Sequence, residues 1–506
     1  MSSSEKIPQF PKTYWRETEL PSFDKLKEDL SVDVAIVGAG ITGITAAYLL
    51  AKEGLKVAIL EAGGVLNGTT GHTTAKITAQ HGLVYDEYIQ HFGEEKAKLY
   101  YESHTKAIQF IKQTAIDCDL SNEDAYIYAT TDEYVGKIKT EMDAYHRLGI
   151  PGEIVNSIPF DIPIKAALVM RNQAQFHPVK YLKKLLEDAV QSGCTVYENT
   201  TATDIEADED HRAVLTNVGH KVTCRHVIVA SHFPFYDGLG FYFARMYAER
   251  SYAIGIKTDK DYPGGMYISA DDPTRSIRYT PINGEKLIII GGENHKTGQG
   301  PDTIVHYDAL KGFAEETFGI SEYAYRWSAQ DLVSLDKIPY IGPITDKKDH
   351  IFVATGYKKW GMTTGTVAGH LLADYILDRD NPYKELYSPS RFDADPNLKK
   401  LISTNADVAG HLLKGKLEFV PKDPSDLQMG EGSVVMHNGK RAGAYKDENG
   451  KLYIVDTTCT HLGCETEWNH AEKTWDCPCH GSRFSYAGDV VEGPALKPLD
   501  NLSEEQ

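Results

Sequence analysis

The sequence predicts an α/β domain in the first part of the chain and a smaller all-β domain at its end. Residues 32–62 follow the order strand, glycine-rich turn, helix, strand, which is typical of α/β folds built on a parallel sheet. From residue 433 onward, short strand-like segments are joined by Asn-Gly turns, the usual signal of β-hairpins. The 506 residues of the chain are enough for about three domains of roughly 100–200 residues each.

The composition is that of an ordinary globular protein, with 41% hydrophobic and 25% charged residues. The net charge of −19 argues against a nucleic-acid partner, since the phosphate backbone recruits Lys and Arg. The start, MSSSEKIPQFPKTYW, lacks the apolar core of a signal peptide, and apolar runs such as LIII at 287–290 are too short for a membrane span. We therefore expect a cytoplasmic protein. Three single cysteines are expected to be small buried residues: Cys118, Cys194 and Cys224.

The first strand–turn–helix unit begins with VDVAIV at 32–37, a compact apolar run that predicts a buried strand. The turn GAGITG follows, then a helical stretch at 44–54 and a second strand, LKVAILEA, at 55–62. A GxGxxG turn between strand and helix, with an acidic residue near the end of the next strand, predicts a Rossmann-type dinucleotide site.

Each glycine of the turn has a mechanical role in such a site. Gly38 permits the tight turn, Gly40 lets the backbone approach a pyrophosphate, and Gly43 allows the helix to pack closely on the strand. The pyrophosphate would lie at the helix N-terminus, where free N–H groups and the helix dipole favour an anion. Glu61, near the end of the second strand, is expected to accept hydrogen bonds from a ribose diol.

Later segments resemble, in order, those of the D-amino-acid oxidase (DAO) superfamily, which includes glycine and sarcosine oxidases. They are GGVLNGTTGHTTAKITAQHG (63–82), RHVIVASHFP (225–234), LDKIPYIGP (335–343), HIFVATGYKKWGMTTGTVAGHLLADYI (350–376) and ELYSPSRF (385–392). The resemblance covers most of residues 30–392. It implies FAD as the cofactor and an FAD-binding α/β domain interleaved with an α+β substrate-binding domain.

The resemblance also implies which further residues contact FAD. They are Thr70 and His72 in the loop after the second strand, Val196 in a stretch that flanks the adenine, and Gly356, Gly361 and Met362 around the last glycine turn. His72 has two interpretations. In some flavin dehydrogenases of the superfamily a histidine in a similar Gly-Thr-Thr-x-His-Thr context is covalently linked to the flavin; otherwise His72 is a polar loop residue that hydrogen-bonds FAD or solvent.

The residues around the expected substrate site leave the substrate open. The amine oxidases of the superfamily place a lysine shortly after the last glycine turn, whereas Lys358 and Lys359 precede the turn here. Arg278 and Tyr279 would hold a carboxylate over the ring or, as we expect, are ordinary outward-facing strand residues. His177, directly before Pro178, is expected to start a helix. No catalytic residue can be named from the sequence.

Four of the seven cysteines lie in two short loops near the end of the chain, CTHLGC at 459–464 and CPCHGS at 477–482. Two cysteines and two histidines would suit a tetrahedral zinc ion, but zinc leaves Cys464 and Cys479 without a role. A Rieske-type [2Fe–2S] cluster, with two thiolates on one iron and two imidazoles on the other, accounts for both loops.

The two loops closely resemble the cluster-binding loops of Rieske proteins of the cytochrome bc1 and b6f type. GDVVEGPALKPL at 488–499 extends this resemblance, which spans about residues 416–506. It implies that Cys459 and Cys477 bind one iron and that His461 and His480 bind the other.

By the same resemblance, Cys464 and Cys479 form a disulfide. Cytosolic thiols are normally reduced, but burial between the two loops would let the bond persist. Ser482 matches the hydroxyl donor to the cluster, whereas Phe484 stands where high-potential members place a tyrosine donor. We therefore expect a reduction potential below that of the respiratory relatives.

The two resemblances divide the chain into domains. We expect an N-terminal extension at 1–29 and a linker at 393–415. The predicted domains are an FAD-binding domain at 30–90, 165–235 and 330–392, a substrate-binding domain at 91–164 and 236–329, and an all-β Rieske domain at 416–506.

FAD and a Rieske cluster in one chain predict an oxidoreductase that converts two-electron into one-electron transfer. The hypothesis is a flavin-dependent dehydrogenase or oxidase of an amine or amino-acid-like substrate, in which flavin accepts hydride and the cluster relays electrons to an external protein or quinone. One alternative is an electron-transfer component for a separate oxygenase or reductase. Another is an oxidase whose cluster is a redox sensor. The sequence does not name the substrate, the acceptor, the direction of electron flow or the oligomeric state.

Overall fold

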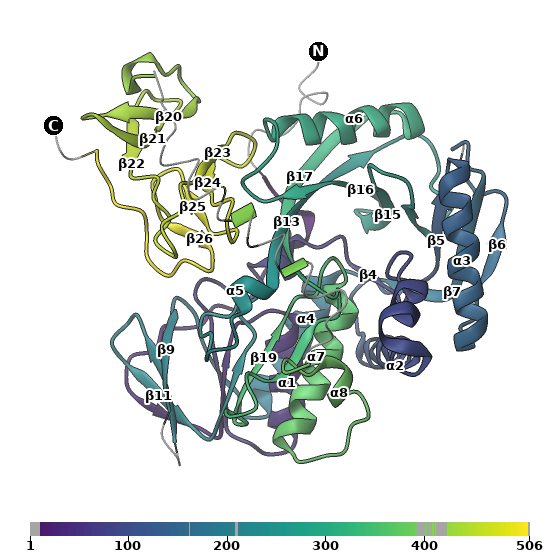
Figure 1. Ribbon diagram of the computed structural model, residues 1–506, viewed down its shortest axis with the longest axis horizontal. Helices are drawn as coiled ribbons and strands as arrows, with labels where there is room; N and C mark the ends of the chain where they lie inside the picture. Colours follow the sequence, from purple (N-terminus) through teal and green to yellow (C-terminus); the bar gives the residue numbers. More distant parts are fainter. Residues whose placement is uncertain are drawn as a thin grey trace.

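The computed structural model describes residues 11–160, 162–207, 211–391, 400–401, 405, 407–408, 410 and 422–503. The start of the expected N-terminal extension, most of the expected linker and the first residues of the expected Rieske domain lie outside the described residues. Figure 1 shows an α/β part, a large sheet with its own helices, and a β-rich C-terminal part beside the large sheet. Within the described ranges, no helix is both long and apolar enough to cross a bilayer.

A six-stranded sheet forms the centre of the α/β part, in the order β18-β19-β12-β2-β3-β8. Neighbouring strands are parallel except β18 with β19. The strands are β2 (Val34–Val37), β3 (Val57–Leu60), β8 (Thr195–Tyr197), β12 (His226–Val229), β18 (Tyr340–Pro343) and β19 (Ile351–Thr355). Strands β2 and β3 are buried along their whole length, as expected of a parallel sheet covered on both faces.

Helices α1 (Ile41–Lys52), α4 (Pro178–Gln191) and α7 (Gly361–Ile376) pack together beside this sheet. Two glycines of α7 permit its close contact with α1. A Cβ atom at Gly365 would lie 2.5 Å from Ile41 Cγ2, and one at Gly369 would lie 2.6 Å from Thr45 Cγ2. The N-termini of α1 and α7 therefore lie close together.

The nine-stranded sheet is the largest in the molecule, in the order β17-β13-β16-β15-β14-β5-β7-β4 with β6 beside β7. Its strands are β4 (Lys76–Ile77), β5 (Ser121–Ala129), β6 (Glu153–Val155), β7 (Ala166–Gln175), β13 (Met246–Lys257), β14 (Met266–Ser269), β15 (Arg275–Ile282), β16 (Glu285–Lys296) and β17 (Glu322–Ser334). Helix α6 (Ile304–Phe318) packs on β13 and β16, and α2 (Tyr85–Thr114) packs on α3 (Asp132–Leu148) and α7.

Strand β7 pairs with β5 and β4 in the nine-stranded sheet. The division expected at residue 165, which assigns residues 165–235 to the FAD-binding domain, therefore does not coincide with the boundary between the sheets. A smaller sheet in the order β1-β11-β10-β9 lies beside the α/β part. Its strands are β1 (Leu30–Ser31), β9 (Ala202–Ala207), β10 (Arg212–Thr216) and β11 (Lys221–Cys224), and the short helices α5 (Tyr242–Arg245) and α8 (Lys384–Tyr387) complete this half of the chain.

The C-terminal part consists of two antiparallel sheets, drawn in yellow-green and yellow in Figure 1. The first contains β20 (Gly432–His437), β21 (Lys440–Lys446) and β22 (Leu452–Val455). The second contains β23 (Glu467–Asn469), β24 (Thr474–Asp476), β25 (Arg483–Ser485) and β26 (Val490–Glu492). The predicted fold class, mixed α/β and α+β parts followed by an all-β part, is confirmed.

Strand β17 lies at the edge of the nine-stranded sheet. Its successive side chains point to opposite faces of the sheet, one face towards the loop around His72 and the other towards the C-terminal sheets. Trp327 donates its indole N–H to the carbonyl oxygen of His72 at 2.9 Å. On the opposite face, Arg326 donates to the carbonyl oxygen of Ala471 at 3.0 Å, and the Gln330 amide donates to that of Gly481 at 2.9 Å. One strand therefore separates the loop around His72 from the C-terminal sheets.

Candidate functional site

The glycine turn after β2 requires glycine for steric reasons. Gly38 has a φ of 110°, and a Cβ atom there would lie 2.5 Å from the carbonyl oxygen of Ala230. A Cβ atom at Gly43 would lie 2.0 Å from the carbonyl oxygen of Gly38. Gly40 precedes α1 and supplies no side-chain cap, so N–H groups of the first turn beyond that of Ile41 remain available to an anion.

Glu61 follows β3 and faces the glycine turn. Its carboxylate accepts the backbone N–H of Ala39 at 2.8 Å and that of Gly63 at 3.0 Å. Burial raises the pKa of Glu61, although these N–H donors oppose the shift. Since each carboxylate oxygen accepts more than one hydrogen bond, Glu61 can hold the turn and a ribose hydroxyl together.

Thr70 and His72 lie in a 3-10 helix, Thr69–His72. The Thr70 hydroxyl accepts the N–H of Ile41, the first residue of α1, at 3.2 Å. The Nδ1 atom of His72 binds the carbonyl oxygen of Gly68 at 2.9 Å, and burial lowers the pKa of His72. The neutral ring therefore keeps Nε2 for a cofactor, and both interpretations of His72 remain predictions.

The other expected FAD contacts gather near the ends of the central strands. Val196 lies on β8 opposite Ile59 of β3, Gly356 follows β19 with a φ of 77°, and Gly361 and the buried Met362 begin α7. Since β2, β3, β12 and β19 are parallel, their carboxyl ends share one edge of the sheet, where dinucleotides bind in open α/β folds. The residues present fit FAD.

The two cysteine loops form a compact site in the C-terminal part. The thiols of Cys459 and Cys477 are both buried, and the ring centres of His461 and His480 are 5.1 Å apart. Among the described residues, the buried Nδ1 atoms of both histidines have no hydrogen-bond partner. A buried polar atom without a partner is costly, so these two atoms are available as metal ligands.

The protonation states of the histidines also suit a metal cluster. Burial lowers the pKa of His461, and burial together with His461 lowers the pKa of His480 to about 4. Both imidazoles are therefore neutral near pH 7, as metal ligation requires.

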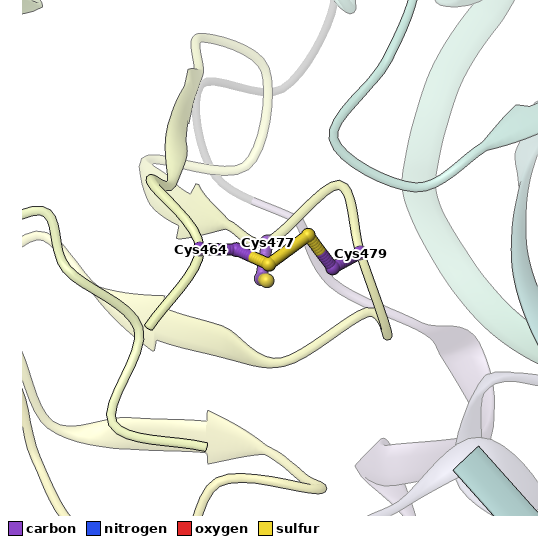
Figure 2. A group of neighbouring side chains, drawn as sticks. All are labelled: Cys464, Cys477 and Cys479. Atoms are coloured by element: carbon purple, nitrogen blue, oxygen red, sulfur yellow. A yellow bond between two sulfur atoms is a disulfide. The ribbon is translucent and has the colours of Figure 1, made fainter. Parts of the chain in front are cut away.

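A disulfide joins the two loops through Cys464 and Cys479. Figure 2 shows these residues with Cys477, and the three sulfur atoms lie within 4.8 Å of one another. Because the sulfurs of Cys464 and Cys479 are bonded to each other, Cys477 and Cys459 are the thiols left for iron. The residues present fit a [2Fe–2S] cluster with two thiolate and two imidazole ligands.

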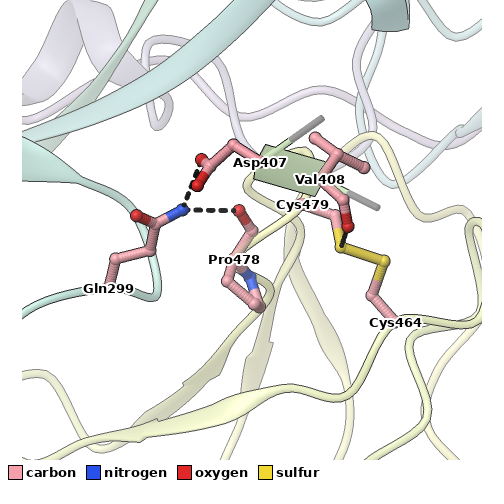
Figure 3. Close-up of a disulfide and its surroundings, with 6 residues drawn as sticks. All are labelled: Gln299, Asp407, Val408, Cys464, Pro478 and Cys479. Atoms are coloured by element: carbon pink, nitrogen blue, oxygen red, sulfur yellow. Dashed lines mark hydrogen bonds between the residues drawn. A yellow bond between two sulfur atoms is a disulfide. The ribbon is translucent and has the colours of Figure 1, made fainter. Parts of the chain in front are cut away.

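The disulfide is shielded by other parts of the chain. Figure 3 shows Val408 and Asp407 beside it, with Gln299 donating to Asp407 at 3.2 Å and to the carbonyl oxygen of Pro478 at 3.4 Å. Cys464 is 2% exposed and Cys479 is 6% exposed. Reductants therefore reach this bond only with difficulty.

Thiol counting tests whether the disulfide persists in the isolated protein. Protein unfolded without reductant is expected to show the five free cysteines that the structure contains, three of them outside the cluster, because only the Cys464–Cys479 pair is oxidised. A parallel sample reduced after unfolding should show all seven cysteines of the sequence. Seven thiols in the unreduced sample would contradict the pairing.

The C-terminal part docks on β13 and β17 through close contacts. A Cβ atom at Gly481 would lie 2.5 Å from Ala248 Cβ, which brings the CPCHGS loop onto the sheet. Gln330 connects the two sites: its side chain donates to Gly481, and its carbonyl oxygen accepts the Thr69 hydroxyl at 3.3 Å. The rings of His461 and His480 also lie close to the flavoprotein part of the chain. The ring centre of His461 is 6.2 Å from that of Phe233, and the ring centre of His480 is 5.9 Å from that of Phe243.

A buried ionic network fastens the same interface. The Arg250 side chain, 1% exposed, lies 3.2 Å from Glu492 and 4.0 Å from Asp476. Arg483 lies 3.1 Å from Asp476 and 3.4 Å from Glu492. Burial alone would raise the pKa of Asp476, but Arg483 and Arg250 hold it below its usual value.

Two sequence expectations about other residues have different outcomes. His177 is the N-cap of α4, and its Nδ1 atom accepts the Lys180 N–H at 3.2 Å, so its predicted role is confirmed. The expectation that Arg278 faces outward is wrong. Its side chain is buried and donates to the carbonyl oxygens of Thr74 and Ala75, because it supports the segment after the flavin loop.

Comparison with known proteins identifies the family. A family model described as FAD dependent oxidoreductase matches residues 33–375. The chain belongs to this family. A second model, the Rieske [2Fe-2S] domain, matches residues 418–503, so this FAD-dependent oxidoreductase carries a C-terminal Rieske domain.

Relatives share either the whole arrangement or its flavoprotein part. A Rieske 2Fe-2S iron-sulfur protein of Bacillus subtilis (strain 168), YhfW, is 53% identical and covers 99% of both chains. Gamma-glutamylputrescine oxidoreductase of Escherichia coli (strain K12) is 25% identical over 74% of this chain and 88% of its own. The structure of glycine oxidase from Geobacillus kaustophilus has a TM-score of 0.61 at 20% identity, over 72% of this chain and 99% of its own.

Proposed function

We propose that this FAD-dependent oxidoreductase oxidises an amine or amino-acid-like small molecule and passes the electrons through its Rieske cluster to an external protein or quinone. Bound FAD would take two electrons from the substrate as hydride, and the cluster would carry them onward one at a time. The names of the oxidoreductase and oxidase relatives support the substrate class.

The observation that carries this proposal is the shared strand β17. The loop around His72 contacts one face of the strand through Trp327, and the cluster loop contacts the other face through Gln330. Packed sheet layers lie about 10 Å apart, so the two cofactors would be separated by little more than one layer. A redox sensor or structural cluster would not need this short separation.

The site geometry supports the following assignment of binding residues. We assign FAD to Gly38, Gly40, Gly43, Glu61, Thr70, His72, Val196, Gly356, Gly361 and Met362. We assign the cluster to Cys459, His461, Cys477 and His480. In this assignment the N-terminus of α1 holds the pyrophosphate, the strand ends hold the rest of FAD, and neutral imidazoles complete the cluster.

Anaerobic reduction by a panel of amines and amino acids tests the relay. We expect one class of substrate to bleach the flavin absorbance, followed by the electron paramagnetic resonance signal of the reduced cluster. The same substrate should bleach the flavin but give no cluster signal in a His480→Ala control. Reduction only by an external donor protein would favour the electron-transfer component instead. Flavin turnover with a permanently oxidised cluster would favour the redox sensor.

A further inference from the structure

The segment that follows β12 lies between the two expected cofactor sites. At its start, a Cβ atom placed on Gly38 would lie 2.5 Å from the carbonyl oxygen of Ala230. At its end, the ring centre of Phe233 is 6.2 Å from that of His461, the expected cluster ligand. Residues 230–233 therefore connect the glycine turn expected to bind FAD with the loop expected to bind the cluster.

Hydrogen bonds hold this segment in one conformation. The hydroxyl of Thr355, the last residue of β19, donates to the carbonyl oxygen of His232 at 2.6 Å. The Ser231 hydroxyl donates to the carbonyl oxygen of Phe233 at 2.8 Å. His232 has a φ of 64°, in the left-handed region that few non-glycine residues adopt. Such a conformation persists where the surrounding structure determines it, so the place of His232 at the carboxyl edge of the central sheet is fixed.

The surroundings of His232 belong to both halves of the chain. Burial lowers the pKa of His232, although Glu492 of β26 and the backbone of Gln330 oppose the shift. The carbonyl oxygen of Gln330 also accepts the hydroxyl of Thr69, in the loop around His72. The His232 ring is therefore neutral near pH 7 and lies where the flavin loop, strand β17 and the C-terminal domain meet.

One nitrogen of this ring has no partner in the chain. His232 is partly buried as a residue, but its Nε2 atom is buried and has no hydrogen-bond partner among the described residues. A buried polar atom without a partner is costly. The missing partner is therefore expected on a bound molecule, and FAD is the molecule expected at this edge of the sheet.

We propose that His232 binds FAD through Nε2. FAD carries hydroxyl groups on the chain that joins its pyrophosphate to its ring. A hydroxyl both donates and accepts hydrogen bonds, so it pairs with either tautomer of a neutral imidazole. His232 is the link between Gly38, at the expected pyrophosphate site, and Thr355, which precedes the expected FAD contact Gly356, and this position favours the hydroxyl-bearing part of FAD.

The contact would fasten FAD to the same short segment that packs on the cluster ligand. Phe233, which meets His461, directly follows His232, so one rigid segment would touch both cofactor sites. The inference needs FAD but no particular substrate or acceptor, and it therefore goes beyond the proposed function.

Three variants of the full-length, cluster-loaded protein test the inference. His232→Ala removes both ring nitrogens. His232→Asn keeps a polar atom near the position of Nδ1 and tolerates the left-handed backbone, whereas His232→Gln keeps one near the position of Nε2. The readouts are FAD release on dilution, followed by flavin fluorescence, and the visible circular dichroism of bound flavin.

The Ala and Asn variants should bind FAD about 3- to 10-fold more weakly, the loss expected of one neutral hydrogen bond, and their flavin dichroism should change. The Gln variant should restore most of both properties. If His72 links FAD covalently, no FAD is released and the dichroism decides.

His226→Ala is the matched control. His226 is the first residue of β12, at the opposite end of the same strand, and its ring centre is 5.0 Å from that of His350. Its replacement should leave FAD release and flavin dichroism unchanged. The iron content of each variant reports whether the cluster loop is intact.

Three results would overturn the inference. Wild-type FAD binding and dichroism in His232→Ala would show that Nε2 does not contact FAD. Wild-type behaviour of the Asn variant, with a loss in the Gln variant, would place the contact at Nδ1. Loss of iron with unchanged FAD binding would assign His232 to the cluster site. A flavin that no amine reduces would instead overturn the proposed function and leave these measurements unaffected.

Discussion

Arg250→Ala is expected to lower the free energy of unfolding by about 3–5 kcal/mol, since removing one partner from a buried ionic network leaves its carboxylates uncompensated. The Arg250 side chain is 1% exposed and contacts Glu492 and Asp476, and it donates to the Ser328 hydroxyl at 2.6 Å. Because these contacts join the sheet to the C-terminal domain, the same change should also slow transfer between flavin and cluster. Denaturant unfolding and rapid-mixing spectroscopy measure the two effects.

Arg171→Ala is the matched control for this prediction. Arg171 pairs with Asp124 and Glu153 at the surface, and half of its side chain is exposed. Exposed ion pairs contribute about 1 kcal/mol or less, so this variant should lose little stability and transfer electrons normally. If Arg250→Ala matched the control in both measurements, the interface network would not hold the domains together.

His461→Ala or His480→Ala is expected to abolish the cluster while leaving flavin bound. Each substitution removes one of two imidazoles proposed for the same iron, and no other described side chain offers a partner at the vacated position, because Cys464 and Cys479 are already bonded to each other. Iron and acid-labile sulfide should fall from about two of each per chain to near zero. The flavin content and the absorbance spectrum of each isolated variant should show that flavin is still bound.

His437→Ala is the control for ligand loss. His437 lies on β20 of the same domain and has its ring beside Asn438, away from both loops. Its replacement should leave iron, sulfide and electron paramagnetic resonance spectrum unchanged. A cluster of normal iron content in His461→Ala would refute the ligand assignment.

The local patterns of the sequence were sufficient for the most regular parts of the structure. The unit from β2 to β3 is encoded by a continuous apolar run, a glycine turn and a helix, all within a short stretch where neighbours in sequence are neighbours in space. The two cysteine loops are equally local, since the cysteine and histidine ligands within each loop are close in sequence. Their positions could therefore be predicted without knowledge of the tertiary fold.

The residues that connect the domains could not be predicted in this way. Gln330 and Arg250 lie in ordinary strand sequences, and their roles depend on which face of a strand each occupies and on what packs there. Arg278 shows the same limit, since its buried position depends on carbonyl groups of Thr74 and Ala75, about two hundred residues earlier. The place of β7 in the large sheet likewise depends on pairing with β5.

Under the proposed function, the buried charges between β13 and the C-terminal sheets determine how an external acceptor would reach the cluster. A C-terminal domain held by Arg250 and Arg483 would not swing out to a distant carrier. We therefore expect the carrier to bind at the outer surface near Leu462, which is 52% exposed and follows His461. Reoxidation should then depend linearly on carrier concentration over a wide range, without the plateau that a slow hinge would impose.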